Sequence, residues 1–409
     1  MTRFNLDGVR AHFPAFSEPA LQGQAFFENA GGSYACAPVI DRLTRFYRQR
    51  KVQPCAPYAA SQLACAEMAE ARSRLAAMLG VETDELSFGP STTNNTYVLA
   101  QAFGELLEPG DTIIVTDQDH EANSGPWRRL AARGIGIREW QMDPVTGHLD
   151  TEQLWALLDD TVRLVCFPHC SNVVGEINPV AEICTRLRAA GIWSCVDGVS
   201  AAPHGLPDVD ALCADIYLFS AYKTYGPHQG LMVIRHALAS RLPNQGHAFN
   251  AAVPWKRFTP AGPDHAQVAA CAGMADYIDA LHALHVDDSA ASAKTRAQRV
   301  HDLMRDHETA LLQPLLDALR GRDDLRLLGP ADPARRVPTV ALVHARPGLD
   351  LATALVSFGI MAGGGSFYAD RALRRLGIDP QHGVLRLSFV HYTSPTEIDQ
   401  LLAALDQVL

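Results

Sequence analysis

The sequence predicts an α/β protein with a doubly wound, mainly parallel sheet and a smaller C-terminal α/β domain. Three observations lead to this prediction. Short apolar runs alternate with amphipathic helical patterns through the middle of the chain, in a βαβ rhythm. Turn-forming residues such as Pro109-Gly110-Asp111 separate these segments. Beyond Gly262 the rhythm gives way to long helical stretches and then to a second, shorter mixture of strands and helices.

The elements are expected in the following order. Strands of the larger domain are predicted at 112–116, 135–140, 162–167, 192–196, 216–219 and 231–235, with helices at 91–107, 122–133, 151–158 and 179–190. Long helices follow at 265–285 and 290–320, then strands at 325–328, 337–343 and 384–388 and helices at 349–358 and 395–405. We expect three parts: an N-terminal segment (1–25) that packs on the smaller domain or covers the site, a larger cofactor-binding domain (26–265), and linking helices with the C-terminal domain (266–409).

Composition narrows the function classes. A chain of 409 residues is long enough for two domains. The net charge of −10 and the lack of a long basic tract argue against binding of nucleic acid or of an anionic membrane. Residues 1–25 lack a signal-peptide pattern, and no run approaches the roughly 18 apolar residues of a membrane span. A cytoplasmic protein is therefore expected.

Cysteines and clustered acidic residues do not predict a metal site. The nine cysteines are scattered without a Cys-x-x-Cys motif, and we expect buried thiols in a reducing compartment. Asp117, Asp119, His120 and Glu121 are close in sequence, but neighbouring residues at a strand end point in alternating directions. We therefore expect no metal.

Lys223 and Asp197 together indicate pyridoxal 5'-phosphate (PLP). Lys223 lies on the Ser- and Gly-rich turn 219–227, and Asp197 ends a predicted strand. A lysine amine can form a Schiff base with the cofactor aldehyde, and an aspartate can face the ring nitrogen. A carboxylate about 4 Å from that nitrogen gains at most about 4 kcal/mol at an effective dielectric near 20, which keeps the ring protonated at neutral pH. A lone lysine is usually a solvated surface residue, so the surrounding motifs decide.

Polar residues elsewhere fit the same cofactor. Ser91, Thr92 and Thr93 open a helix, where free N–H groups and the positive end of the helix favour a phosphate. His120 is expected to lie flat on the cofactor ring, and Asn172 to hold the phenolic oxygen. Each also has an ordinary structural explanation, because Ser and Thr cap helices and Asn forms turns.

Arg386 alternates with apolar residues on a predicted strand. Its planar guanidinium fits a bidentate clamp on the α-carboxylate of an amino acid. A structural ion pair on an edge strand explains the residue equally well.

In this order, the motifs resemble the class V aminotransferase superfamily of fold-type I PLP enzymes, nearest its cysteine desulfurase and selenocysteine lyase branch. The resemblance begins at Phe-Phe-Glu-Asn-Ala-Gly-Gly (26–32) and reaches the C-terminus. Its most specific parts are Asp-His-Glu-Ala-Asn-x-x-Pro-Trp (119–127), Ser-Asn-Val-x-Gly (171–175), Val-Asp-Gly (196–198) and Phe-Ser-x-x-Lys-x-Tyr-Gly-Pro (219–227).

The resemblance implies a sheet of the seven-stranded type and a homodimer with its sites at the interface. It also implies roles for single residues. Lys223 is the Schiff-base residue, and Lys223 and His120 are the catalytic residues. Asp197 faces the ring nitrogen, and His120 stacks on the ring. Further cofactor ligands are Asn172, Ser91, Thr92, Thr93, Ser220 and Ser200, and the substrate-binding residues are Arg386, Asn29, Ala30 and Tyr368.

Four departures from the family pattern limit the activity. Tyr222 stands where desulfurases often have His before the lysine, and Ser200 where many have Gln. Gly262 replaces a Thr that reaches the phosphate of the neighbouring subunit. The loop that carries the sulfur-accepting Cys is Gly-Gly-Gly-Ser-Phe-Tyr-Ala (363–369), with Tyr368 at the expected Cys position. A persulfide cannot form on Tyr.

The expected function is PLP-dependent β-elimination of the C–S lyase type on a small α-amino acid. Lys223 would form the aldimine and act as general base, and a quinonoid carbanion would follow. The alternatives are racemisation or epimerisation and transamination, with Tyr58, Tyr222 and Tyr368 as candidate acids. A non-catalytic PLP-binding protein is a more distant alternative. A Rossmann dehydrogenase is disfavoured, because no Gly-x-Gly-x-x-Gly follows the first strand.

Overall fold

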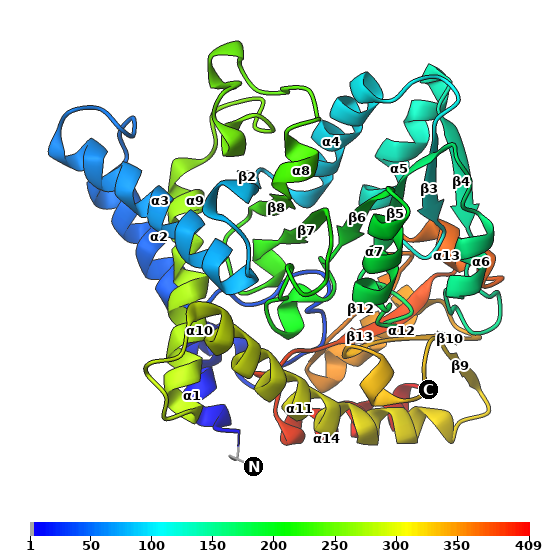
Figure 1. Ribbon diagram of the computed structural model, residues 1–409. Coiled ribbons are helices and arrows are strands. Elements are labelled where there is room, and N and C mark those ends of the chain that lie inside the picture. The colour runs from blue at the N-terminus through cyan, green and yellow to red at the C-terminus, as the bar shows by residue number, and fades with distance from the viewer. Residues whose placement is uncertain (1–3) are drawn as a thin grey trace.

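A seven-stranded sheet forms the centre of the computed structural model, which describes residues 4–409 (Figure 1). The strand order is β2-β8-β7-β6-β5-β3-β4; β8 is antiparallel to both neighbours and the remaining pairs are parallel. The mainly parallel sheet predicted from the sequence is confirmed. Its strands are β2 (Leu86–Gly89), β3 (Thr112–Thr116), β4 (Gly136–Trp140), β5 (Val162–Pro168), β6 (Trp193–Asp197), β7 (Ile216–Ser220) and β8 (Gly230–Ile234).

Helices cover both faces of this sheet, because successive side chains of each strand point to opposite faces. On β5, for example, Leu164 belongs to a core shared with Phe103 and Trp127, whereas Val165 belongs to a second core shared with Leu187. The first face is covered by α4 (Thr92–Leu106), α5 (Glu121–Arg128) and α8 (His236–Ala239), and the second by α3 (Ala59–Leu79), α7 (Val180–Ala189) and α10 (Ala272–His285). The short α6 (Thr151–Ala156) follows β4 in the chain.

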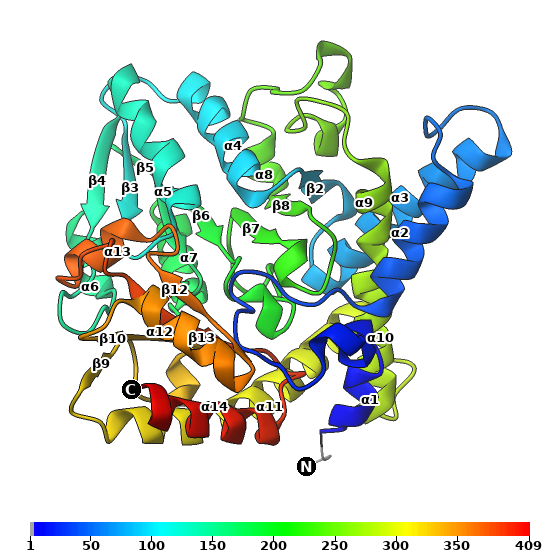
Figure 2. The ribbon, with the colours of Figure 1, turned by 180° about the vertical axis from the view of Figure 1, so that it is seen from behind.

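A second sheet lies beneath the first in Figure 1 and is antiparallel, in the order β12-β13-β10-β9. It has its own apolar core, which includes Leu312, Leu355 and Leu405 from three helices. Its strands are β9 (Leu325–Leu327), β10 (Thr339–His344), β12 (Gly363–Gly365) and β13 (Val384–Ser388). The accompanying helices, seen from behind in Figure 2, are α11 (Ala293–Arg320), α12 (Gly348–Leu355), α13 (Asp370–Arg375) and α14 (Pro395–Val408).

The N-terminal residues contact this C-terminal part. β1 (Ala25–Phe26) pairs in parallel with β11 (Ile360–Met361). In α1 (Leu6–Arg10), Arg10 Nε donates to Tyr392 O at 2.8 Å, and the guanidinium also pairs with Glu397. The boundaries proposed at residues 25 and 265 stay predictions, and residues 1–3 lie outside the described part of the chain.

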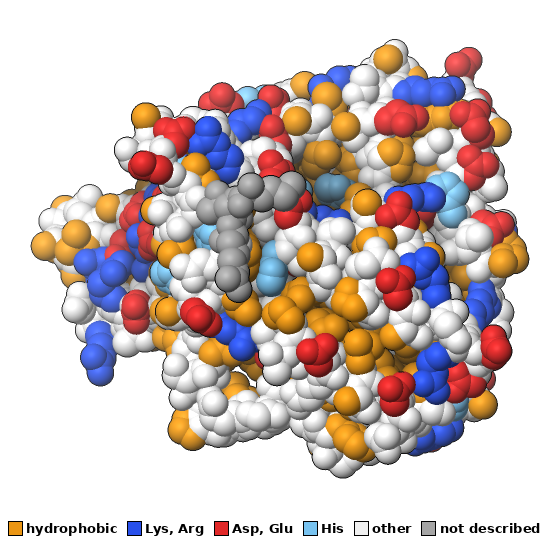
Figure 3. All heavy atoms as spheres, turned by 90° about the horizontal axis from the view of Figure 1, so that it is seen from below, with side chains coloured by type: hydrophobic (Ala, Val, Ile, Leu, Met, Phe, Trp, Pro, Cys, Tyr) orange, Lys and Arg blue, Asp and Glu red, His pale blue; other side chains and the backbone are white. Residues whose placement is uncertain are grey.

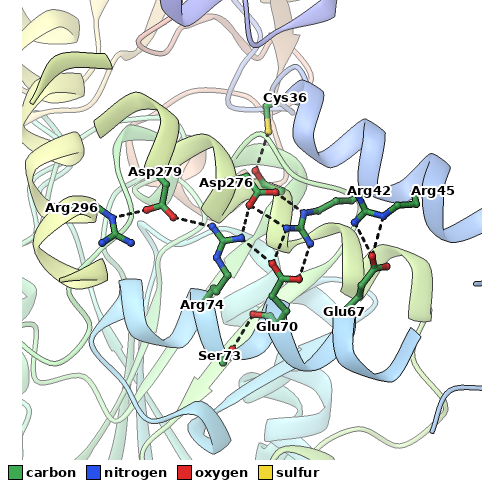
Figure 4. Close-up of polar contacts among 11 residues, drawn as sticks. Cys36, Arg42, Arg45, Glu67, Glu70, Ser73, Arg74, Asp276, Asp279 and Arg296 are labelled. Atoms are coloured by element: carbon green, nitrogen blue, oxygen red, sulfur yellow. Dashed lines mark hydrogen bonds and ion pairs between the residues drawn. The ribbon is translucent and has the colours of Figure 1, made fainter. Parts of the chain in front are cut away.

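A projecting pair of helices, α2 (Ala37–Gln49) and α3, forms an arm at one side of the molecule (Figure 1). Charged side chains tie the arm to α10 (Figure 4). Arg42 bonds to Glu70 at 2.8 Å and to Asp276 at 2.6 Å, and Arg74 bonds to Asp279 at 2.9 Å. Arg296 extends the network to α11 through Asp279. Because several half-buried charges share partners, the network fixes the arm better than isolated surface pairs would.

The helices α2, α3 and α13 were not predicted, and two further segments differ from the predicted elements. The glycines 363–365 were expected in a loop but form β12 at the edge of the second sheet. Added Cβ atoms at Gly363 and Gly364 would overlap Glu28 and the backbone of Gly348, so the close packing requires glycine. The predicted helix 265–285 is divided at Cys271 into α9 (His265–Ala270) and α10.

The expectation of nine free thiols is wrong for two cysteines. Cys55 and Cys65 form a disulfide at the end of the arm, because the first turns of α3 bring Cys65 back against the preceding loop. The other seven are free, six of them buried.

The lower face of the molecule in Figure 1 is shown in Figure 3, where acidic and basic side chains are interspersed among apolar ones. Within residues 4–409, no helix combines the length and apolar character needed to cross a bilayer.

Candidate active site

Two adjoining cavities lie where β5, β6 and β7 end, the position at which open α/β sheets bind ligands. The inner cavity has a volume of about 500 Å³ and the outer one about 1120 Å³. They share Thr93, His120, Asn172 and Lys223 in their linings, so they form one continuous cleft.

Lys223 and Asp197 face the inner cavity from neighbouring strand ends. Asp197 is the last residue of β6, and Lys223 ends a short turn directly after β7. Their side chains are buried, with 9% and 5% of Lys223 and Asp197 exposed. Burial, and then the nearby Arg386 guanidinium, lower the pKa of Lys223 to about 8. Burial raises the pKa of Asp197 to about 6, against the opposing effects of the Val199 N–H and Lys223.

Hydroxyl groups line the end of the inner cavity at the N-terminus of α4. Ser91 caps the helix by accepting from Asn94 N at 3.1 Å, and Thr93 is exposed beside it. Thr92 Oγ1 and Ser220 Oγ lie 2.8 Å apart. These hydroxyls and the free N–H groups of the first helical turn form a cradle for an anion.

His120 is the N-cap of α5 and is held as a neutral imidazole. Its Nδ1 accepts from Ala122 N at 3.0 Å, so Nε2 carries the proton. Burial, and then the positive charges of Lys223 and Arg386, lower its pKa to about 3. The neighbouring Asp119 accepts from His120 N at 2.9 Å and from Asn123 Nδ2 at 2.7 Å, which fixes the turn that carries the ring.

Asn172 provides a direct test of whether a cofactor fits. One amide hydrogen is used by Phe367 O at 3.0 Å, while the buried Oδ1 has no partner among the described residues. A buried unpaired polar atom in a cleft indicates a missing ligand or water. A buried lysine, a buried aspartate, a hydroxyl cradle and an unsatisfied amide match the amine, ring nitrogen, phosphate and phenolic oxygen contacts that PLP needs.

The outer cavity contains Arg386, which lies on β13 and is 3% exposed. Its Nη2 donates to Glu28 Oε1 at 2.6 Å and its Nη1 to Asn172 O at 3.3 Å. The ring of Phe367 covers the guanidinium at 3.7 Å. Arg386 is therefore already paired within the chain.

The other predicted residues divide into two groups. Ala30, Tyr222 and Tyr368 line the outer cavity, and Ser200 lines the inner one. Asn29 is not among the lining residues, because its side chain bonds to Phe26 O, Ser388 O and the Tyr392 hydroxyl. Tyr58 precedes α3 on the projecting arm and is in neither lining.

Among the lining residues that sequence reasoning missed, three bear on the chemistry of the cleft. Glu28 precedes Asn29 in the 26–32 motif, which was the available signal for its importance. Asp119 was considered only as part of a possible metal cluster. Cys170 lies far from the 363–369 loop in sequence but lines the inner cavity. Burial raises the pKa of its thiol to about 12, so it stays protonated.

The fold and this cleft define a PLP-dependent enzyme of fold type I. The family model for aminotransferase class V matches residues 25–401. The chain belongs to this superfamily, in the cysteine desulfurase-like branch.

Relatives resemble the chain over nearly its whole length. The aminotransferase-like protein FGM3 of Gibberella zeae is 32% identical, with 99% of each chain covered. A cysteine desulfurase of Serratia proteamaculans is 30% identical, over 99% of this chain and 98% of its own. Among solved structures, the cysteine desulfurase CsdA of Escherichia coli is 26% identical with a TM-score of 0.80, covering 99% and 98% of the two chains. The apo cysteine desulfurase of Thermococcus onnurineus NA1 shares the fold, with a TM-score of 0.85 at 22% identity over 100% and 98%.

Proposed function

We propose that the protein catalyses β-elimination of the C–S lyase type on a small α-amino acid, without a cysteine persulfide. The observation that carries this proposal is a cleft that combines Lys223 and Asp197 with a loop, residues 363–369, that contains no cysteine. Among the described residues that line the two cavities, the one thiol is Cys170. It donates to Gly175 O at 3.2 Å and is 2% exposed, which leaves no nucleophile to accept sulfur.

In this proposal the inner cavity holds PLP. Lys223 Nζ binds the cofactor aldehyde, Asp197 faces the ring nitrogen, and His120 lies against the ring. Asn172 contacts the phenolic oxygen, and Ser200 lies nearby. Ser91, Thr92, Thr93 and Ser220 surround the phosphate. When bound, the cofactor supplies an electron sink for negative charge that develops on the substrate α-carbon.

Lys223 is the proposed general base. A lysine with a pKa of about 8 is partly neutral at physiological pH, so Nζ can take a proton from the substrate α-carbon. His120 stays neutral throughout this range, because its pKa lies near 3. Its role is to position the ring by contact, and its Nε2 proton stays in place.

Arg386 is the proposed partner of the substrate α-carboxylate, since it is the guanidinium in the lining of the outer cavity. Arg386→Ala should raise KM for α-amino acids about 100-fold, because the substrate carboxylate loses a charged hydrogen-bond partner. Cofactor content should stay unchanged, because Arg386 is not among the proposed cofactor ligands. Unchanged kinetics would exclude this role.

We also propose a cytoplasmic homodimer. Phe249, Tyr58 and Leu63 are large, exposed and apolar, and Gly262 shares a cavity with Ser91 next to the proposed phosphate cradle. Burial of these side chains against a second copy would remove apolar surface from water. In a reducing cytoplasm Cys55 and Cys65 would exist as thiols. Light scattering during gel filtration measures the assembly; a monomer at micromolar concentration would exclude the dimer.

Two measurements test the main proposal. Borohydride reduction followed by peptide mapping should recover the cofactor on Lys223, and a label on another residue would overturn the assignment. A panel of L- and D-amino acids, including cysteine thioethers, sulfoxides and sulfinate, should yield pyruvate with release of the β-substituent. Loss of optical activity without release would show a racemase or epimerase instead, and formation of an oxo acid with an intact β-substituent would show an aminotransferase.

A further inference from the structure

The substrate end of the cleft contains a resident carboxylate. Glu28 Oε1 accepts from Arg386 Nη2 at 2.6 Å, and the pair joins residues that are 358 positions apart. Arg386 is buried, whereas the Glu28 side chain is 28% exposed. Glu28 is therefore the more accessible partner of the pair.

The Nη1–Nη2 edge of Arg386 is occupied in this arrangement. A bidentate clamp uses two parallel N–H groups on one side of the guanidinium. On this edge Nη2 donates to Glu28 and Nη1 donates to Asn172 O. The other edge includes Nε, which is buried and has no partner among the described residues, and the Phe367 ring covers one face of the guanidinium. A substrate α-carboxylate that binds the Nη1–Nη2 edge must therefore displace Glu28.

The chain makes room for the Glu28 carboxylate on two sides. A Cβ at Gly31 would lie 2.7 Å from Glu28 Oε1, and a Cβ at Gly363 would overlap Oε2. Oε2 is buried and has no partner among the described residues. A carboxylate oxygen that is packed in place but unsatisfied calls for a hydrogen-bond donor.

The charged residues around the outer cavity indicate that this hydrogen-bond donor is a cation. Its lining contains two basic residues, Lys223 and Arg386, and two acidic ones, Glu28 and Glu121. Lys223 is committed to the cofactor, and Glu121 already faces Arg371 at 3.4 Å. When a substrate carboxylate takes Arg386, Glu28 becomes an unpaired carboxylate beside another one, which is unfavourable in a partly buried site.

We propose that Glu28 makes this site selective for α-amino acids whose side chain carries a second cationic group, which pairs with Glu28 while the α-carboxylate takes Arg386. When such a substrate binds, Arg386 pairs with its carboxylate and Glu28 pairs with its cationic group, in place of their pairing with each other. Specificity arises from repulsion as well as attraction, because an amino acid with an apolar side chain leaves Glu28 unpaired. The inference rests on the proposed function and narrows its substrate class.

A pair of matched ligands tests the inference. L-2,4-Diaminobutyrate and L-norvaline have side chains of equal length, and they differ in an ammonium in place of a terminal methyl group. Binding to the PLP-loaded protein is measured by the change in cofactor absorbance and independently by calorimetry. We expect the wild-type protein to bind the diamino acid about tenfold more tightly, the size of one charge-assisted hydrogen bond.

Glu28→Gln is the decisive variant. Glutamine retains the size of Glu28 and an oxygen for Arg386, but it removes the negative charge. The ratio of the affinities for the two ligands should therefore fall to about one, or the preference should reverse. Glu121→Gln is the matched control, because it removes a carboxylate from the same cavity and leaves Arg386 and Glu28 paired. The preference should persist in this control.

The outcomes separate the two proposals. A wild-type protein that binds both ligands with equal affinity overturns the specificity inference and leaves the proposed function standing. An equal preference in Glu28→Gln and the wild type also overturns the inference, as does loss of the preference in Glu121→Gln. Failure of borohydride to fix the cofactor on Lys223 overturns the proposed function itself, and the inference with it.

Discussion

Thr92 Oγ1 and Ser220 Oγ lie 2.8 Å apart, although 128 residues separate them in the chain. Thr92 opens α4 and Ser220 ends β7, so one hydrogen bond joins a helix N-terminus to a strand end at the floor of the cleft. Each hydroxyl has one proton and can redirect it to an anion. This pair is the structural basis of the proposed phosphate cradle.

Thr92→Val and Ser220→Ala should each weaken PLP binding by about tenfold or more, because each removes a hydrogen bond to a charged group. The dissociation constant can be measured by adding PLP to the cofactor-free protein and following absorbance. Thr353→Val is a suitable control, since its hydroxyl bonds to Leu349 O on the exposed side of α12. Equal affinities for all four proteins would exclude the cradle.

Gly230 supports the same helix terminus from below. A Cβ at this position would overlap the backbone of Ser91 and lie 2.6 Å from Thr92 N. Gly230→Ala should therefore displace the N-terminus of α4 and lower PLP affinity by about tenfold or more, with a destabilisation of about 1–3 kcal/mol from overpacking. In Gly321→Ala the added Cβ meets nothing closer than 3.8 Å, so this variant should behave as the wild type. Normal cofactor retention in Gly230→Ala would contradict the assignment of the phosphate to this helix.

The stability of the cofactor-free protein should depend on pH through Lys223. Burial lowers its pKa from 10.5 to about 8, so the unfolded chain holds this proton more tightly than the folded one. The free energy of unfolding should therefore rise with pH between about 8 and 10.5, by at most about 3 kcal/mol. Urea unfolding at both ends of this range measures the change. Lys223→Met should lack this component, and an identical pH dependence in the two proteins would refute it.

Replacement of Tyr368 should restore a sulfur acceptor. Its ring is 76% exposed and lies 5.5 Å from the ring of His120. We expect Tyr368→Cys to form a persulfide from L-cysteine with alanine as the co-product, and a reductant should release the bound sulfur as sulfide, whereas the wild type and Tyr368→Ser should form no persulfide. Sulfide and alkylated persulfide are measured directly. Persulfide formation on the wild-type protein would show that another thiol accepts sulfur.

Local chemistry explains what the sequence could predict. Apolar runs such as 216–219 correspond to β7, because a strand buried on both faces is apolar almost throughout. Asp197 ends β6 and His120 opens α5, while Lys223 and Asn172 lie in the turns that follow β7 and β5. Parallel strands bring such ends to one edge of the sheet. Their convergence therefore follows from the predicted topology.

Long-range packing explains what the sequence could not predict. No local pattern shows that Glu28 meets Arg386, or that Cys170 lines the inner cavity. Glycines disfavour strands, so a strand at Gly363–Gly365 contradicts propensity and depends on contacts with Glu28 and Gly348. The Cys55–Cys65 disulfide depends on the path of the loop between the two cysteines, and the length of that loop alone does not define its path.

The pairing of β1 with β11, and of Glu28 with Arg386, has a consequence for the order in which the protein matures on the ribosome. The seven strands of the large sheet are complete once residue 234 has been synthesised, and domains generally fold as the chain emerges. Ala25, Phe26 and Glu28 then wait for partners at positions 360, 361 and 386. The cofactor cradle is thus assembled early in synthesis, and the end that recognises the substrate is completed last, so an unfinished chain cannot discriminate between amino acids.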